Sequence, residues 1–324
     1  MPKELRPRHG SLQVWPRKRA RRIYPRVRSW IEKEETKLLG FAFYKVGMTH
    51  ILGIDTNPNS LAKGEKVMYP VTMIECPPLK PLSLRFYKNS DYGLKAVTEI
   101  FSQKLDKELA RKIRLPKKSK DNLKDIESKL NEFHDLRLVV YTQPKLTGIG
   151  KKKPEIFEIA ISGKNLNDKF NYAKNLLDKE IKISDVFKSG QLIDTHAVTK
   201  GKGFQGVIKR FGTSLKQKKS EKKKRSGILG SWTPKRVSWT VPHTGQMGFH
   251  TRTDYNKIIF AIKSNPNEIN PKSGFTNYGL IKNDYLLIKG SVPGAKKRLI
   301  RLIEAIRPMK HYPVEISYIS LTNK

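Results

Sequence analysis

Residues 201–206 read Gly-Lys-Gly-Phe-Gln-Gly and match the GxGxxG string of nucleotide-binding loops. A dinucleotide loop needs a hydrophobic strand before it, an apolar helix after it and an acid about 20 residues on. Here the basic segment VIKRFGTSLKQKK follows, the nearest downstream acid is Glu221 in a lysine run, and the kinase motifs VAIK, HRD and DFG are absent. The string therefore favours a turn that lets the backbone approach phosphates, with charge from Lys200, Lys202, Lys209 and Arg210. An RNA-modifying enzyme that holds a cofactor in this loop is the alternative.

The histidines have neither metal-binding nor catalytic spacing. His243 and His250 are seven residues apart, HExxH is absent, and no GxSxG elbow supplies a nucleophile. Asp194 and His196 lie near each other without a serine in a recognisable setting. We therefore expect structural or RNA-contacting histidines, and we predict no catalytic residue, metal or cofactor.

Two tryptophans follow the glycine-rich turn. Trp232 and Trp239 are seven apart, but Pro234 and Pro242 argue against a helix, so an extended loop is predicted. One interpretation buries both rings in a core. The other makes the loop a finger whose rings wedge into folded RNA, with Lys235 and Arg236 beside them on the RNA backbone. The run KQKKSEKKKR before it fits either a solvated tip or a polyanion contact with little sequence preference.

The charge of the chain indicates a polyanionic partner. Its 324 residues include 66 Lys and Arg against 29 Asp and Glu, a net charge of +37. Residues 200–257 hold fifteen of the basic residues and two acids, a local charge of +13. Nucleic acid is the commonest polyanion, and an anionic membrane is the competing partner. Membrane binding through the lysine run requires an amphipathic basic helix, which the surrounding prolines and glycines disfavour.

The amino-acid composition indicates a hydrophobic core and a reducing cellular compartment. A hydrophobic content of 37% is enough for a real core in one or two domains. Cys76 is the only cysteine, which excludes disulfides and suggests a reducing compartment. The longest apolar run, residues 38–44, is far shorter than the ~20 residues of a membrane span, and no signal peptide is visible. A soluble, cytosolic protein is expected.

The N-terminal arm is predicted to be extended. Residues 1–30 carry ten Lys and Arg, one acid and four prolines, interleaved with Trp15, Tyr24 and Trp30. Proline blocks regular helix and the charges prevent collapse, so a partner should order this arm. A disordered tail is the alternative. Aromatic rings among arginines favour an arm that lines RNA, because bases stack on the rings while guanidinium groups bind phosphate.

The rest of the chain has β-rich segments near both ends and a segment of mixed helices and strands between them. β-Branched and aromatic runs, with turn residues every eight to twelve positions, predict antiparallel strands at 38–55, 66–75, 82–88, 257–262, 284–290, 298–306 and 314–321. Strands at both ends suggest one β-domain closed by distant segments. Between them, apolar residues three and four apart predict helices over 123–133 and 166–177, N-capped by Asp121 and Asn165, with strands at 136–143 and 155–161. This α/β insertion has 22 basic residues and 14 acids over 95–188, so it should face solvent or protein.

These segments together resemble a known family. The ordered motifs GKGFQGVIKRFG, GSWTPKRVSWTVPHTGQMGFHTRTDYN, HGSLQVWPRKRARR and FAFYKVGMTHI resemble the large-subunit ribosomal protein L three family, in its archaeal and eukaryotic form, over nearly the whole chain. Eukaryotic members place a methylatable histidine directly after the residue that matches Trp232. This chain has Thr233 there, so that modification does not carry over.

The resemblance implies a mainly β fold: a closed six-stranded translation-protein-type barrel with an α/β insertion and two long extensions that run into large-subunit rRNA. In the family, the central loop approaches the peptidyl transferase centre with a tryptophan near its tip, and Trp239 occupies that position. The expected domains are an arm at 1–36, the barrel at 37–92 and 189–324, the insertion at 93–188, and the loop at 200–256. A closed sheet leaves no edge for aggregation, which suits a scaffold that presents charged arms.

The sequence thus predicts a structural RNA-binding component of the cytoplasmic large ribosomal subunit, not an enzyme. Its partners should be rRNA and neighbouring ribosomal proteins, with no membrane and no small-molecule substrate. The predicted RNA-binding residues are Trp15, Arg17, Lys18, Arg19, Arg21, Arg22, Lys200, Lys202, Lys209, Arg210, Lys222, Lys223, Lys224, Arg225, Trp232, Lys235, Arg236, Trp239, His243, Gln246, His250 and Arg252.

Overall fold

A computed structural model describes residues 8–115, 126–217, 219, 224, 227 and 229–321. The chain divides into two compact units. The first unit comprises residues 1–23 and 198–252, and the second comprises residues 24–197 and 253–324. Among the described residues, no helix has the length and apolar character needed to span a membrane.

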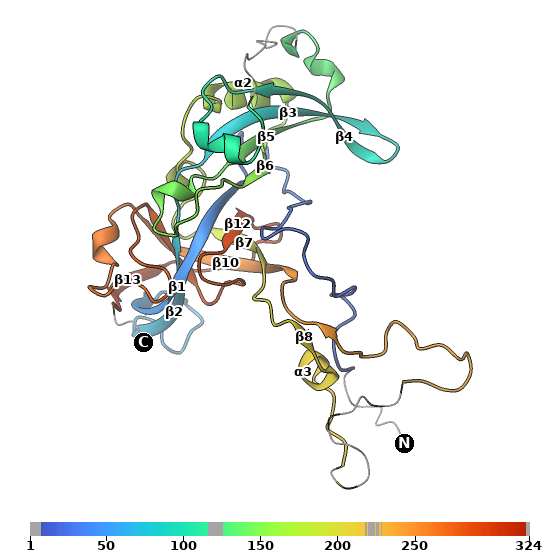
Figure 1. Cartoon of the computed structure of the whole chain (residues 1–324). Helices are drawn as coiled ribbons and strands as arrows, with labels where there is room; N and C mark the ends of the chain where they lie inside the picture. Colours follow the sequence, from blue (N-terminus) through green and yellow to red (C-terminus); the bar gives the residue numbers. More distant parts are fainter. Residues whose placement is uncertain are drawn as a thin grey trace. The chain divides into compact units, whose positions relative to one another are not determined.

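The larger sheet has seven strands, in the order β12-β7-β10-β11-β2-β1-β13. Figure 1 labels six of them, all except β11. The strand β1 pairs with β2 and β13 and also with β12, the strand at the other end of that order. The pairings of β1 with β2, β12 and β13, of β11 with β2 and β10, and of β7 with β12 are antiparallel, as the sequence predicts. The strands are β1 Gly40–Asp55, β2 Lys66–Glu75, β7 Leu192–Val198, β10 Thr251–Lys263, β11 Tyr285–Lys289, β12 Leu299–Glu304 and β13 Val314–Ile319.

The strand β1 is long enough to pair with three other strands. Its first half is fully buried and pairs with β12, from Gly40 opposite Ile303 to Tyr44 opposite Leu299. Its second half pairs with β13, where Gly53 lies so close that a Cβ there would be 2.4 Å from Cγ1 of Val314. A larger residue at that position would force the two strands apart.

A second sheet has four strands, in the order β4-β3-β5-β6. The strands are β3 Lys80–Ser90, β4 Gly93–Phe101, β5 Asp135–Tyr141 and β6 Ile156–Ala160. The sequence groups residues 82–88 with the strands of the barrel, but β3 pairs with β4 and β5 instead. Hydrogen-bonding partners decide membership of a sheet, and strand propensity alone carries no information about them.

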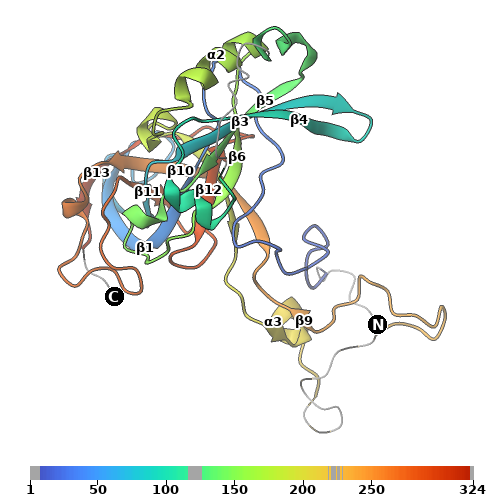
Figure 2. The same cartoon turned by 45° about the horizontal axis from the view of Figure 1, so that its top comes forward.

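The helix α2, Leu166–Leu176, lies against the four-stranded sheet (Figure 2). Phe170 of α2 reaches Phe86 of β3, with ring centroids 6.2 Å apart. This confirms the predicted helix and the position of Asn165 as its N-cap, although the Asn165 side chain makes no cap hydrogen bond. The predicted helix over 123–133 is shorter at its C-terminal end, because Ile126 and Glu127 are helical but Leu130–Glu132 form a 3-10 turn. Asp121 and Leu123 lie outside the described residues. The other 3-10 turns are Lys107–Arg111, Pro144–Leu146, Ile183–Asp185 and Pro266–Glu268.

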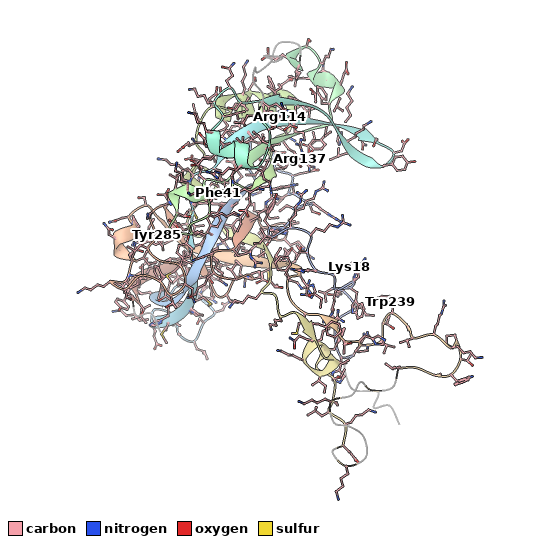
Figure 3. All side chains as sticks on the ribbon, viewed as in Figure 1. Lys18, Phe41, Arg114, Arg137, Trp239 and Tyr285 are labelled. Atoms are coloured by element: carbon pink, nitrogen blue, oxygen red, sulfur yellow. The ribbon has the colours of Figure 1, made fainter. Side chains whose placement is uncertain are left out.

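One hydrophobic core runs through both sheets of the second unit. It includes Phe41 and Tyr285 of the larger sheet, which Figure 3 labels, together with Phe86 of the smaller sheet. Buried apolar area is the main source of folding free energy, so the two sheets stabilise each other. The only cysteine, Cys76, is buried in this core, and burial raises the pKa of its thiol.

The first unit has little regular structure. β8, Phe204–Gln205, pairs with β9, Gly245–Gln246, and is followed by the short helix α3, Val207–Phe211. Gly212 ends α3 in the left-handed conformation, at φ 69°, which glycine adopts without strain. The described residues of the arm before Tyr24 and of the loop between α3 and β9 contain no further helix or strand, as the prolines predict.

Candidate nucleic-acid interface

Arg210 holds the base of the central loop together. From the last turn of α3, its Nε donates to the carbonyl oxygen of Gln246 at 3.0 Å and its Nη1 donates to that of His243 at 2.9 Å. The planar guanidinium offers donors in a fixed fork, which suits two neighbouring carbonyls. Arg210 was predicted as a phosphate contact, but two of its donors are engaged within the protein. Partial burial lowers its pKa.

The N-terminal arm packs on the same loop base. The Trp15 ring stacks on Phe211, with centroids 5.6 Å apart and planes at 24°. The Arg17 guanidinium lies 4.2 Å from the Phe211 ring centroid, and its Nη1 donates to the carbonyl oxygen of Arg210 at 3.1 Å. Gly10 passes so close that a Cβ would be 2.4 Å from Phe211. The arm is therefore ordered by the loop, not only by a partner.

Trp239 completes this aromatic cluster. Its ring meets Trp15 edge-on, at a centroid distance of 5.7 Å, and stays 66% exposed. Next to it, Arg8 Nη2 donates to the carbonyl oxygen of Thr240. Trp239 therefore has an aromatic partner on the arm. Figure 3 labels Trp239 and Lys18, both in this unit.

Trp232 is the most exposed large ring of the loop, at 81%. The Lys235 ammonium lies 5.7 Å from its ring centroid, and the backbone at Lys235 is left-handed, at φ 63°. The interpretation that buries Trp232 and Trp239 in a core is therefore wrong. Each ring leaves one face or edge free for a stacking partner.

His250 joins the arm to the end of the loop. The ring is buried, and Nδ1 lies 2.8 Å from the carbonyl oxygen of Lys18. One residue away, Phe249 accepts a backbone hydrogen bond from Ala20 at 2.8 Å, and Arg19 lies 5.5 Å from the Phe249 ring centroid. Of the two expectations for His250, the structural role fits this burial, since the ring has little surface left for RNA.

The described residues of the first unit include no carboxylate side chain. Residues 8–23 and 198–252 contain one acid, Glu221, which lies outside the described residues. The Arg17 pKa is lowered, first by burial and then by the neighbouring charges of Arg210, Arg252 and Arg8. Grouped guanidinium groups with no described carboxylate among them repel one another, and a bound anion would relieve that repulsion.

The predicted RNA-binding residues differ in their exposure to solvent. Trp15, Arg17, Arg210, His243, Gln246 and Arg252 are half-buried. Lys222, Lys223 and Arg225 lie outside the described residues. The exposed residues are Lys18, Arg19, Arg21, Arg22, Lys200, Lys202, Lys209, Lys224, Trp232, Lys235, Arg236 and Trp239.

The sequence motifs do not single out two further aromatic residues of this surface, Phe204 and Phe211. Phe211 is buried beneath Trp15 and Arg17, and Phe204 of β8 is 74% exposed beside Lys202. The signal for Phe204 was its place inside a glycine-lysine turn, where an apolar side chain has nothing local to pack on. Phe211 gave no signal, because a phenylalanine before a glycine also fits an ordinary helix end.

A mainly β scaffold that carries a basic unit with exposed rings and no described acid defines a nucleic-acid-binding protein of the structural kind. The chain belongs to the family described as "Ribosomal protein L3", whose sequence model matches residues 1–321. That family is one of ribosomal proteins and not of enzymes, so the enzyme alternative gains no support.

Three archaeal relatives show how close the similarity is. The proteins of Methanococcus aeolicus and Methanocaldococcus jannaschii are each 48% identical, covering 99% and 98% of this chain and 98% and 97% of their own. The protein of Archaeoglobus fulgidus is 49% identical over 325 residues, 98% of each chain. All three are named "Large ribosomal subunit protein uL3".

Proposed function

We propose that this protein is a structural component of the large ribosomal subunit that binds and organises rRNA in the cytoplasm. The observation that carries the proposal is the basic first unit, in which the loop region 200–257 alone has a charge of +13. Family membership and the names of the relatives support it. Neighbouring ribosomal proteins are the other partners, reached most easily through the less basic insertion.

Binding combines charge neutralisation with stacking. The exposed lysines and arginines neutralise phosphates and release counterions, which supplies most of the affinity but little sequence preference. The exposed rings of Phe204, Trp232 and Trp239 offer platforms for unpaired bases. Because Trp15, Arg17 and Phe211 already tie the arm to the loop, part of the ordering cost precedes RNA binding.

The finer architecture is part of the same proposal. Strand pairing runs around β1, β2, β11, β10, β7 and β12, which supports closure of these six strands into a barrel of the translation-protein type. The pairing of β3 favours an insertion that begins near Lys80 instead of residue 93. We place the arm at 1–36 and the loop at 200–256, with the loop approaching the peptidyl transferase centre.

The salt dependence of rRNA binding tests the proposal. The purified full-length chain is titrated with large-subunit rRNA from 50 to 500 mM salt, and the logarithm of the affinity should fall with a slope of about −0.7 to −0.9 for each phosphate contact. Replacing the exposed pair Lys200 and Lys202 by Gln should reduce that slope, whereas replacing Lys107 and Lys112 of the insertion should not. An affinity nearly independent of salt would contradict the proposal.

A cofactor titration separates the enzyme alternative. The same preparation is titrated with S-adenosylmethionine, NAD and ATP. We expect no saturable binding to the 201–206 turn, since its following segment is basic and its glycine backbone is exposed. Saturable binding that is lost when Gly203 is replaced would support the enzyme alternative.

A further inference from the structure

An open pocket of about 690 Å³ lies in the second unit, and none of the predicted RNA-binding residues lines it. One wall is the arm segment 28–34, and the others come from β5, the chain after β6, and Leu94 of β4. Backbone hydrogen bonds hold this wall in place: Gly163 donates to the carbonyl oxygen of Lys33 at 3.0 Å, and Ser162 to that of Lys37 at 2.9 Å. The volume falls within the range of ordinary ligand sites.

The charge of the pocket is positive overall. Its lining includes five lysines and arginines against three carboxylates. Four of the five cations are paired within the protein: Lys164 with Glu34 at 2.8 Å, Lys33 with Glu304, and Arg137 and Lys169 with Asp135 at 3.0 and 3.9 Å. Arg28 is exposed and makes no ion pair with any described residue. An anionic group is therefore favoured at the Arg28 side.

The floor of the pocket is apolar and aromatic. Ile31, Leu39 and Ala160 contribute apolar surface, and Leu94 adds a side chain that is 41% exposed. The half-buried Trp30 ring lines the same space, and its indole NH is buried with no acceptor among the described residues. A flat apolar group would use this aromatic and apolar surface, and a plain carboxylate side chain would not.

We propose that this pocket takes one unpaired nucleotide of the rRNA. The base lies against Trp30 and Leu94, and the phosphate is held by Arg28. Single-stranded RNA offers such splayed bases, and proteins bind them by stacking together with charge. The inference rests on the proposed function and adds a second RNA site, on the four-stranded sheet. An acidic protein segment would find the same positive charge, but it would leave the aromatic floor unused.

A filling substitution with a matched control tests the site. Leu94→Trp occupies the pocket, whereas Val97→Trp changes the same strand at a side chain that is 52% exposed and does not line it. Full-length wild type and both variants are bound to large-subunit rRNA, and nucleotide reactivity is measured by chemical probing. With Leu94→Trp we expect one or a few nucleotides to lose protection and the affinity to fall about tenfold, near the low end of what one stacked base contributes. Val97→Trp should match wild type.

Two arginine substitutions test the proposal independently. Arg28→Gln should remove the same protection and reduce the salt slope by about 0.7, as expected for one lost phosphate contact to a single strand. Arg26→Gln is the control, because Arg26 is also exposed but does not line the pocket. Equal losses from both arginine variants would overturn the proposal, since the arm would then bind RNA uniformly.

The remaining outcomes separate the two proposals. If the wild type does not bind rRNA at all, the proposed function fails. If wild type binds and Leu94→Trp leaves every protection in place, the pocket proposal is overturned and the proposed function stands. Loss of a neighbouring ribosomal protein from large subunits that carry Leu94→Trp, with unchanged rRNA reactivity, would also overturn it by pointing to a protein occupant.

Discussion

Trp239 and Trp15 meet edge-on, with ring centroids 5.7 Å apart and an angle of 73° between the planes. The two residues belong to the loop and the arm, which are remote in sequence but part of one compact unit. Since Trp15 also stacks on Phe211, the three rings form a continuous series from α3 through the arm to the loop. Both extensions should therefore keep part of their structure before RNA binds.

The first prediction concerns this contact. Aromatic pairs contribute about 0.5–1.5 kcal/mol beyond burial, so Trp15→Ala and Trp239→Ala should each loosen the arm, with a coupling energy of that size in a double-mutant cycle. Hydrogen exchange at the amides of Ala20 and Arg210 measures the loosening. Trp232→Ala is the control, because Trp232 has no ring partner among the described residues. Additive effects of the Trp15 and Trp239 changes would show that the rings do not support each other.

The second prediction concerns Arg210. Arg210→Lys keeps the charge but cannot bridge the carbonyl oxygens of His243 and Gln246, so the loop base should open by roughly 1–2 kcal/mol. Limited proteolysis and hydrogen exchange across 243–247 measure this. Lys209→Arg changes an exposed neighbour and serves as control. Unchanged protection at 243–247 would mean that the β8–β9 pairing alone holds the loop.

The third prediction concerns a buried carboxylate. Glu75 accepts hydrogen bonds from the backbone N of Lys282 and Asn283, at 2.8 and 3.1 Å, from Asn283 Nδ2 at 2.8 Å, and from the Tyr278 hydroxyl. Glu75→Ala leaves those donors unsatisfied and should destabilise the second unit by roughly 3 kcal/mol or more. Chemical denaturation measures the loss, with the exposed Glu65→Ala as control. A Glu75→Ala midpoint equal to that of the control would contradict the role of this carboxylate.

The fourth prediction is a pH dependence. Burial, and then the charge of Arg301, lowers the pKa of His196 to about 4. The ordinary pKa is about 6.5, so between these values the unfolded chain binds a proton that the folded chain does not. Stability should fall as pH drops from about 6.5 to 4, by roughly 2–3 kcal/mol in all.

Variants identify the group that titrates in this window. His196→Gln keeps a polar side chain near Thr253, whose hydroxyl lies 2.9 Å from His196 Nδ1, and should flatten the pH dependence. His134→Gln, at an exposed position, should leave it as in wild type. Equal slopes for wild type and His196→Gln would assign the loss of stability to other groups.

The fifth prediction returns to Trp239. Because its ring is 66% exposed, Trp239→Ala should leave the second unit folded and weaken the function of large subunits at the catalytic centre. The measurement is the response of purified subunits to tRNA and to drugs that bind there, alongside the melting temperature of the free chain. An unfolded free protein with unchanged subunits would instead give the ring a core role.

The sequence was sufficient wherever local chemistry decided the outcome. Charge segregation predicted an RNA-binding arm and loop, and Pro234 and Pro242 excluded a helix. Runs of β-branched and aromatic residues predicted most of the strands, although not β4, β7, β8 or β9. Asn165 marked the start of α2. Each of these depends on neighbours within a few residues, which the sequence displays directly.

Only the tertiary structure decided which of these segments meet. The pairing of β3 with β5, the packing of Trp15 on Phe211 and the burial of His250 against Lys18 all join residues far apart in the chain. Such contacts depend on how distant segments share one core or one aromatic cluster, a free energy of packing that no local pattern encodes. The sequence therefore determined the kind of partner, and the tertiary structure decided which cations and rings remain free to bind it.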